Sequence, residues 1–437
     1  MKFGGTSVGR PERMHHIVNL VTSQEEPVIV VLSALSGTTN ALVEIGQLMA
    51  ACKKEEAGAA IEKLQDHYRQ FVSELVKSET ATQKAQKIIE EHFEFLRIIL
   101  KISFSESLSK DILAQGELLS TKLFCACLEE KGVEHVFLPA LDFMLIDEYE
   151  EPALDSIREK LTAQLASHST KKLFITQGYI CKNSRGEVDN LKRGGSDYTA
   201  SLVAAAIRAS VCEIWTDIDG MHNNDPRVVE KTFPIEQLSF DEAAELAYFG
   251  AKILHPASIW PAQMFSVPVR LLNTMQPEAK GTLITAKPAA AGVKAVAAKD
   301  QITAIHIRSS RMLLAYGFLR KIFEVFEKYR TPIDMITTSE VAVSLTIDSS
   351  QQLPFILKEL EPFGTISIDK DQIIVSVVGH EIASDGSILA KLAESTKGIP
   401  VSMISYGGSP HNISLLTDAT QKTKLLQQLN KGIFGLV

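Results

Sequence analysis

The sequence predicts an α/β protein in which a three-layer αβα sandwich is followed by two ferredoxin-like (βαββαβ) units. Up to about residue 285, short apolar runs typical of buried parallel strands alternate with helical patterns. A Pro- and Ala-rich stretch, 288–292, then breaks the pattern. Beyond it, two related segments form an internal repeat of about 70 residues. We therefore expect a first domain over 1–287, a linker over 288–300 and a paired region over 301–437.

Composition is that of a globular protein and excludes several kinds of partner. The 437 residues are 45% hydrophobic and 22% charged, with a net charge of -8 and no basic block. Nucleic acids and anionic membrane surfaces are therefore not expected partners. There is no run of about 18 apolar residues and no secretory pattern, and the five cysteines lack zinc-site spacing. We expect a cytoplasmic protein with reduced thiols and no metal held by the protein itself.

The first residues combine a lysine with two glycines. Lys2, followed by Gly4 and Gly5, could cradle a phosphate, with the lysine as a point charge. The spacing is not that of a P-loop. The strand that should carry Lys2 has almost no residues before it, so we expect either a very short strand or a native start further upstream. Pro11 suits the first turn of a helix that runs to about residue 21.

A buried strand is expected over 28–33, because this run is apolar and rich in β-branched residues. The loop 34–40 follows its C-terminal end, which is where open α/β sheets bind ligands. Ser33 and Thr39 are therefore candidate site hydroxyls. As simple turn and cap residues they would need no ligand.

The following region is helical. A helical hairpin is expected over 57–100, with a break near 78–80. A further helix runs to Gly132, a suitable C-terminal glycine. Glu117 lies one place off the apolar stripe of that helix. The pattern leaves two interpretations open, a solvated helix residue or a carboxylate of a site.

The sequence is organised around the stretch 191–200. It follows a strand-like run, 171–178, and precedes a helix of small residues. It holds Arg193 and two glycines just before a helix N-terminus, where free N–H groups and about half a positive charge attract anions. We expect Ser196 to cap that helix and Asp197 to lie in its first turn. The alternative is a glycine-rich loop that only caps a helix.

The next buried strand, over 211–216, ends in two polar residues, Thr216 and Asp217. A tight turn with a cation, Arg227, comes shortly afterwards. Asp217 and Arg227 could serve a nucleotide, although such turns need no ligand.

Three further elements complete the sandwich. A helix is expected over 238–249, and Lys252 lies just past the glycine that ends it. Strands are expected over 267–272 and 281–285.

Each unit of the paired region has the pattern strand, helix, strand, strand, helix. Two pairs of segments match between the units, 332–337 with 400–405 and 343–348 with 413–418. An extra strand, 301–307, precedes the first unit, and the second lacks a clear last strand. We predict that 301–307 completes the second unit, which continues over 371–437. The first unit, about 308–370, would then be nested inside the second.

Several short motifs, taken together and in order, resemble those of the aspartate kinase (aspartokinase) family. They are KFGGTSV at 2–8, QGE at 115–117, RGGSD at 193–197, WTD at 215–217, DPR at 225–227 and FGAK at 249–252. The resemblance covers essentially the whole chain and implies an amino-acid kinase catalytic domain over 1–287, followed by tandem ACT domains. No dehydrogenase domain follows, so the chain resembles the monofunctional form.

This resemblance implies MgATP-dependent phosphorylation of the β-carboxylate of L-aspartate to 4-phospho-L-aspartate, the first step of lysine, threonine and methionine biosynthesis. It assigns catalysis to Lys2, Arg193 and Asp197. It assigns ATP binding to Lys2, Phe3, Gly4, Gly5, Thr216, Asp217, His222, Arg227, Lys252 and Ile253. It assigns substrate binding to Ser33, Thr39, Glu117, Arg193, Gly194 and Ser196. Mg²⁺ would be held mainly by phosphate oxygens and water.

The acceptor is already an anion at pH 7, so the implied chemistry needs no general base, only positioning and neutralisation of charge. Lys2 would neutralise the transferred phosphoryl group, Arg193 would bind the α-carboxylate of aspartate, and Glu117 would pair with its ammonium. His222 stands where tyrosine is common in the family, so we expect a difference in stacking or polarity at the nucleotide there.

The tandem ACT units imply feedback control by an amino acid, and 337–346 resembles the lysine-sensitive class. A lysine effector has an ammonium at each end, and Asp334 and Glu340 offer two carboxylates near one predicted strand pair. The residues implied to meet the effector are Met312, Ala315, Gly317, Phe318, Leu319, Asp334 and Glu340. The alternative is that both carboxylates face solvent. Because ACT units usually pair, the resemblance implies a homodimer through them, or a tetramer.

Two other functions compete with this interpretation. A related amino-acid kinase could act on glutamate, N-acetylglutamate or UMP, because one methylene separates aspartate from glutamate. The ACT region, and the presence of both Glu117 and Arg193, favour a free amino acid as substrate. A non-catalytic amino-acid sensor is the second alternative, and the retained Lys2, Asp197 and Lys252 argue against it.

Overall fold

The computed structural model describes residues 1–437 except 103, 192–193, 251–253, 288–290, 313–315 and 437. Within the described residues the chain forms two compact units. The first contains Met1–Gly220 and Leu254–Ala286, and the second contains Met221–Ile253 and Lys287–Val437. No helix of the described residues is long and apolar enough to cross a membrane.

The first unit is built on a mostly parallel sheet with the strand order β3-β4-β2-β1-β7-β9-β10. The strands are β1 (Lys2–Phe3), β2 (Val28–Leu32), β3 (Val136–Phe137), β4 (Leu173–Gln177), β7 (Cys212–Thr216), β9 (Val269–Asn273) and β10 (Thr282–Thr285). Only the β9–β10 pair is antiparallel among these neighbours. A small hairpin, β5 (Ile180–Lys182) and β6 (Val188–Asn190), leads towards the 191–200 loop.

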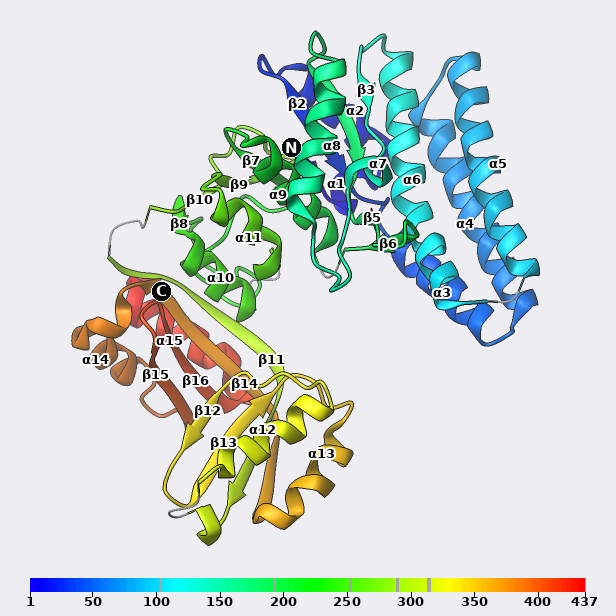
Figure 1. The fold of residues 1–437 in the computed structure, drawn as a ribbon. Coiled ribbons are helices and arrows are strands. Elements are labelled where there is room, and N and C mark those ends of the chain that lie inside the picture. Colours follow the sequence, from blue (N-terminus) through cyan, green and yellow to red (C-terminus); the bar gives the residue numbers. More distant parts are fainter. Residues whose placement is uncertain (103, 192–193, 251–253, 288–290, 313–315, 437) are drawn as a thin grey trace. The chain divides into compact units, whose positions relative to one another are not determined.

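Helices cover both faces of this sheet, which gives the three-layer sandwich (Figure 1). Side chains alternate along β4, so Leu173 and Ile175 join one core while Phe174 joins the other. The first core contains α2 (Pro11–Thr22), α3 (Thr38–Ala50), α4 (Lys54–Leu75), α5 (Glu79–Lys101) and α6 (Glu106–Glu130). The second contains α7 (Ala140–Phe143), α8 (Leu154–Ser167) and α9 (Gly195–Ile207), and α11 (Pro256–Met264) packs on α9. The predicted α/β class is confirmed.

The helical hairpin expected from the sequence is α4 with α5. The break falls where predicted, because Ser78 caps α5 and its hydroxyl accepts the Ala81 N–H at 3.2 Å. Glu130 at the end of α6 accepts the backbone N–H groups of Lys77 and Ser78, which ties the break to the neighbouring helix.

The second unit contains an antiparallel sheet with the strand order β12-β13-β11-β14-β16-β15. The strands are β11 (Gly292–Arg308), β12 (Ile336–Thr338), β13 (Ala342–Ile347), β14 (Thr365–His380), β15 (Met403–Ser409) and β16 (Asn412–Asp418). Its helices are α12 (Phe318–Lys328), α13 (Leu353–Leu360), α14 (Gly386–Ser395) and α15 (Lys422–Phe434). In Figure 1 the two long strands β11 and β14 run through both βαββαβ units.

The register corrects how these two units are nested. The first half of β11, Gly292 to Lys299, pairs with the end of β14 and completes the second unit. The 301–307 segment, predicted for that role, instead pairs with β13 inside the first unit. Residues 292–299 were expected to be linker because they are rich in alanine, which is a poor strand signal. Ala295 and Ala297 are nevertheless buried in the sheet.

Residues 221–253 lie in the first domain by sequence but pack with the second unit. This segment contains β8 (Gln237–Ser239) and α10 (Phe240–Tyr248), which begins with a capping box formed by Ser239 and Glu242. Val229 joins the same core as Leu425 and Leu429 of α15. The tertiary contacts of the segment therefore belong to the C-terminal part of the chain.

Candidate active site

The candidate site of the first unit lies at the carboxyl ends of four neighbouring parallel strands, β4, β2, β1 and β7. The loops that leave these ends contain Gly178, Ser33, Gly4 and Asp217. Such an edge of an open α/β sheet is the usual place for a ligand.

Lys2 and Asp197 form an ion pair at this edge. The Lys2 Nζ lies 2.7 Å from the Asp197 Oδ1, and the two side chains are 11% and 15% exposed. Lys2 is held because β1 pairs with β2 on one side and with β7 on the other, although the strand has only two residues. Asp197 comes from the first turn of α9, as predicted. Two of the three predicted catalytic side chains are thus brought together.

The two glycines after β1 leave room beside this ion pair. A Cβ atom on Gly4 would lie 3.2 Å from the Lys2 Nζ, and one on Gly5 would lie 3.1 Å from the Ala34 carbonyl oxygen. The Gly4 N–H already donates, at 3.4 Å, to the carbonyl of Trp215. Gly5 opens the four-residue helix α1 (Gly5–Val8). Backbone rather than side chain therefore surrounds the Lys2 ammonium on this side.

Glu117 is a buried carboxylate, so the solvated alternative is wrong. The residue is 4% exposed, and its Oε1 accepts the Ala34 N–H at 3.1 Å. Its Oε2 is buried without a hydrogen-bond partner among the described residues. Burial raises the pKa of Glu117 to about 7, against the opposing effects of the Ala34 N–H and Lys2. The signal missed in the sequence is Gly116: a Cβ there would lie 2.8 Å from the Ala34 Cβ, so only glycine lets α6 approach the loop.

The start of α9 differs from the predicted cap. Gly194 is the N-cap, in the left-handed region at φ 76°, and Ser196 is already inside the helix. Gly195 packs directly against the Tyr179 ring, where a side chain would not fit. Because glycine adopts positive φ without strain, the helix can begin earlier than a serine cap would allow. Arg193 lies outside the described residues.

The predicted hydroxyls have different environments. Ser33 is half-buried, and its N–H donates to the Phe3 carbonyl at 3.2 Å. Thr39 is exposed in the first turn of α3, whereas the unpredicted Thr38 is buried and bonded to the Tyr68 hydroxyl at 3.0 Å. Sequence reasoning had no means of choosing between two adjacent threonines.

A hydroxyl pair near β1 was also missed. The Ser7 Oγ lies 2.7 Å from the Thr274 Oγ1, and both side chains are buried. Thr274 directly follows β9, a parallel neighbour of β7. Its place after a strand end was the available signal.

The predicted nucleotide residues are divided between the two units. In the first unit the Thr216 hydroxyl donates to the Asp217 Oδ1 at 3.2 Å, and Asp217 is exposed. In the second, His222 bonds to the Thr232 hydroxyl at 2.9 Å. The Arg227 guanidinium is bidentate to Asp225, at 2.9 and 2.8 Å, and is largely exposed. Lys252 and Ile253 lie outside the described residues.

The predicted effector carboxylates lie at opposite ends of β12. The Asp334 side chain is 1% exposed. Its Oδ1 lies 2.6 Å from the Lys299 Nζ and accepts a hydrogen bond from the Tyr248 hydroxyl at 2.6 Å. Its Oδ2 is buried without a partner among the described residues. Burial, with Asp334 beside it, raises the pKa of Tyr248, so the hydroxyl stays a donor. Glu340 is exposed in the turn between β12 and β13.

The other predicted effector residues that the structure describes lie at the start of α12 or shortly before it. Gly317 is its N-cap, in the left-handed region at φ 76°. Met312, Phe318 and Leu319 are half-buried against the core of the first βαββαβ unit. Ala315 lies outside the described residues.

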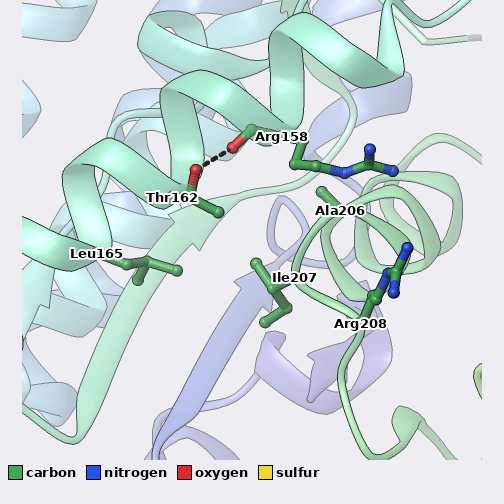
Figure 2. Close-up of a pocket in the computed structure, with 6 residues that line it drawn as sticks. All are labelled: Arg158, Thr162, Leu165, Ala206, Ile207 and Arg208. Carbon is green, nitrogen blue, oxygen red and sulfur yellow. Dashed lines mark hydrogen bonds between the residues drawn. The ribbon is translucent and has the colours of Figure 1, made fainter.

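One hollow in the first unit is distant from the candidate site. It measures about 390 Å³ and lies between α8 and the C-terminal end of α9, with Arg158, Thr162 and Arg208 among its lining residues (Figure 2). Asp197 is in the first turn of α9, so most of a 13-residue helix, roughly 15 Å, separates the two places. The hollow therefore belongs to the far end of that helix.

Two family models match the chain. A sequence model described as the amino acid kinase family matches residues 1–273, and one described as ACT domain matches residues 375–432. The chain belongs to the amino acid kinase family, and within it to the aspartokinases.

Full-length relatives support this narrower assignment. The lysine-sensitive aspartokinase 3 of Escherichia coli is 32% identical, over 99% of this chain and 98% of that protein. The chloroplastic aspartokinase 1 of Arabidopsis thaliana is 34% identical, over 99% of this chain and 80% of that protein. The structure of E. coli aspartokinase III with aspartate and ADP superposes with a TM-score of 0.84 at 30% identity and covers 99% of each chain.

Proposed function

We propose that this protein transfers the γ-phosphoryl group of ATP to the β-carboxylate of L-aspartate and is inhibited by an amino acid, lysine. The observation that carries the catalytic part is the largely buried Lys2–Asp197 pair beside a glycine turn at the edge of the parallel sheet. The solved complex of the E. coli relative with aspartate and ADP supports the choice of substrates.

The transfer needs charge neutralisation and no proton. A β-carboxylate oxygen of aspartate forms the new bond to the γ-phosphorus as the bond to the β–γ bridging oxygen of ATP breaks, which gives 4-phospho-L-aspartate and ADP. Lys2 stabilises the charge on the transferred group. Asp197 keeps the ammonium of Lys2 in place through their ion pair. Positioning residues account for the rest of the acceleration.

Aspartate is recognised by its own charges. The Glu117 Oε2, which has no hydrogen-bond partner among the described residues, accepts the substrate ammonium, and this new hydrogen bond compensates the buried carboxylate. Arg193 binds the α-carboxylate, because a guanidinium suits a bidentate contact. Ser33, Thr39, Gly194 and Ser196 line the pocket around these groups.

We assign contacts with ATP to Lys2, Phe3, Gly4, Gly5, Thr216 and Asp217. The other residues assigned to the nucleotide are His222, Arg227, Lys252 and Ile253. Mg²⁺ enters with the nucleotide. Among the described residues no three His, Cys, Asp or Glu side chains converge to hold a metal. Phosphate oxygens and water suit the ion as its main ligands.

Inhibition by lysine acts through the second unit. Asp334 supplies a buried carboxylate oxygen for an effector ammonium, and Met312, Ala315, Gly317, Phe318, Leu319 and Glu340 surround the effector. The E. coli relative is named lysine-sensitive, and one of its structures contains lysine and aspartate. The enzyme would work in the cytoplasm as a homodimer or tetramer joined through its ACT domains, in the first step of lysine, threonine and methionine biosynthesis.

The deciding experiment measures ATP turnover with aspartate and traps the acyl phosphate with hydroxylamine, with and without lysine. Aspartate-dependent hydroxamate that lysine suppresses supports both parts of the proposal. Hydroxamate that only threonine suppresses overturns the lysine part. Hydroxamate formed from glutamate but not aspartate overturns the substrate, and none with any amino acid favours a sensor.

A further inference from the structure

The loop that contains His222 and Arg227 is built into the second unit. Its ends are closed by backbone hydrogen bonds from Asn223 N–H to the Phe233 carbonyl at 3.1 Å and from Ile235 N–H to the Met221 carbonyl at 2.7 Å. The Asn223 carbonyl accepts the Val296 N–H of β11 at 2.8 Å. The loop is therefore attached to the sheet of the regulatory region.

Three buried asparagines hold this loop against α15, the last helix of the chain. Asn223, Asn224 and Asn430 are 0%, 3% and 1% exposed. The Asn430 Oδ1 accepts from the side-chain amides of both Asn223 and Asn224, at 3.3 Å each. The Asn430 Nδ2 donates back to the Lys231 carbonyl at 3.0 Å, at the other end of the loop. Asn430 thus contacts both arms of the loop.

The network continues to the guanidinium that faces solvent. Asn224 is anchored a second time, because its amide donates to the Leu426 carbonyl at 3.2 Å. Its Oδ1 accepts the Asp225 N–H at 2.9 Å, and Asp225 holds Arg227 through a bidentate pair. A continuous series of hydrogen bonds therefore links α15 through Asn224 and Asp225 to Arg227, and it fixes the position of the guanidinium.

A simple packing role does not require this chemistry. Apolar side chains could fill the same space beside Leu425 and Leu429, without three amides that must all be satisfied. A fully hydrogen-bonded network of buried amides holds the loop in a single geometry, because each hydrogen bond requires a particular direction as well as contact. A loop that positions a charged group for a ligand needs this property.

We propose that Asn430, through Asn224, is a positioning residue for the nucleotide, and that it holds the Arg227 loop of the kinase on the last helix of the ACT region. The inference rests on the proposed function, which assigns ATP contacts to this loop. A change in the position of α15 would then alter the position of Arg227.

The test uses Asn430→Leu and Asn224→Ala, singly and together, in the full-length protein. Loss of the amide bonds is expected to raise KM for ATP about tenfold in each single variant, with KM for aspartate within about twofold of the wild type. ADP binding measured by calorimetry should weaken by the same factor. KM for ATP of the double variant should be no higher than that of the more affected single variant, because both substitutions break the same network.

Leu392→Ala is the matched control, because Leu392 lies in the same core but on α14. It should lower the melting temperature and leave KM for ATP unchanged. If the asparagine variants melt lower but bind ADP normally, or if KM for aspartate rises equally, Asn430 is only structural and the inference is wrong. Absence of aspartate-dependent turnover in the wild type would instead overturn the proposed function. Should Asn430→Leu not fold, Asn224→Ala decides alone.

Discussion

Replacing Glu117 by glutamine should stabilise the first unit while removing its use of aspartate. Glutamine has nearly the same shape and can still accept the Ala34 N–H, but it has no charge to bury. The Glu117 Oε2 has no hydrogen-bond partner among the described residues. If this oxygen serves the substrate ammonium, burial of its charge destabilises the ligand-free protein, and the neutral glutamine avoids that cost.

The magnitude of this cost follows from the pKa of Glu117. Burial raises that pKa from 4.5 to about 7, which corresponds to about 3 kcal/mol. Between these two pH values the folded state binds more protons than the unfolded state, so the stability of the ligand-free wild type falls as pH rises. Glu117→Gln should therefore gain about 1 kcal/mol at pH 5 and about 3 kcal/mol at pH 8, roughly 2 and 6 °C in melting temperature.

Tryptophan fluorescence provides the assay, because both tryptophans of the chain, Trp215 and Trp260, belong to the first unit. Thermal melts of wild type and Glu117→Gln would be compared at pH 5 and pH 8, with and without aspartate. Aspartate should raise the melting temperature of the wild type only. Asp111→Asn is the control, because Asp111 is a partly buried carboxylate on the same helix, and it should keep full aspartate use.

Either of two results would refute this reasoning. A glutamine variant no more stable than the wild type at pH 8 would mean that the buried carboxylate costs nothing. A gain of equal size at both pH values would mean that the effect does not come from its ionisation. A variant that is more stable but still uses aspartate normally would separate the burial of Glu117 from substrate recognition.

Three further substitutions test the roles proposed for Arg193, Lys2 and Asp334. Arg193→Ala should lower kcat/KM for aspartate at least about tenfold, because a charge-assisted hydrogen bond is lost; near-normal kcat/KM would contradict its role. Lys2→Met should lower kcat by roughly 10²- to 10³-fold in the hydroxamate assay, since charge on the transferred group is no longer neutralised; a change confined to KM would argue for binding only. Lys299→Met removes the cation from Asp334 and should lower the half-inhibitory lysine concentration at least about threefold. Weaker inhibition would mean that Lys299 helps to bind the effector.

The overall class of fold could be predicted because it depends on local patterns. Buried β-branched runs, the Ser78 break and the internal repeat are each encoded within a few neighbouring residues. The exact boundaries of the nested units could not be predicted, because alanines at 295 and 297 give a weak strand signal. Their burial comes from pairing with β14, about 80 residues later in the chain.

The details of the site could be predicted only in part. Motif order identified Lys2 and Asp197, and the structure brings them together. The burial of Glu117 depends on a close approach at Gly116 that no periodicity reveals, and the choice between Thr38 and Thr39 depends on the distant Tyr68. Packing between residues that are distant in the sequence decides these features, so local sequence patterns do not predict them.

The two units share one feature that we propose serves to recognise an amino acid. Glu117 in the first and Asp334 in the second are each buried, with one oxygen bonded and the other without a partner among the described residues. An isolated buried carboxylate oxygen is costly, and an incoming ammonium supplies the missing charge and hydrogen bond. The two differ in one respect. Asp334 already has a cation 2.6 Å away in Lys299, whereas the nearest described support of Glu117 is a backbone N–H. The charge of Asp334 is therefore partly compensated without a ligand, which suits the regulatory role that we propose for it, whereas Glu117 has the greater need of a charged ligand, which suits the proposed substrate site.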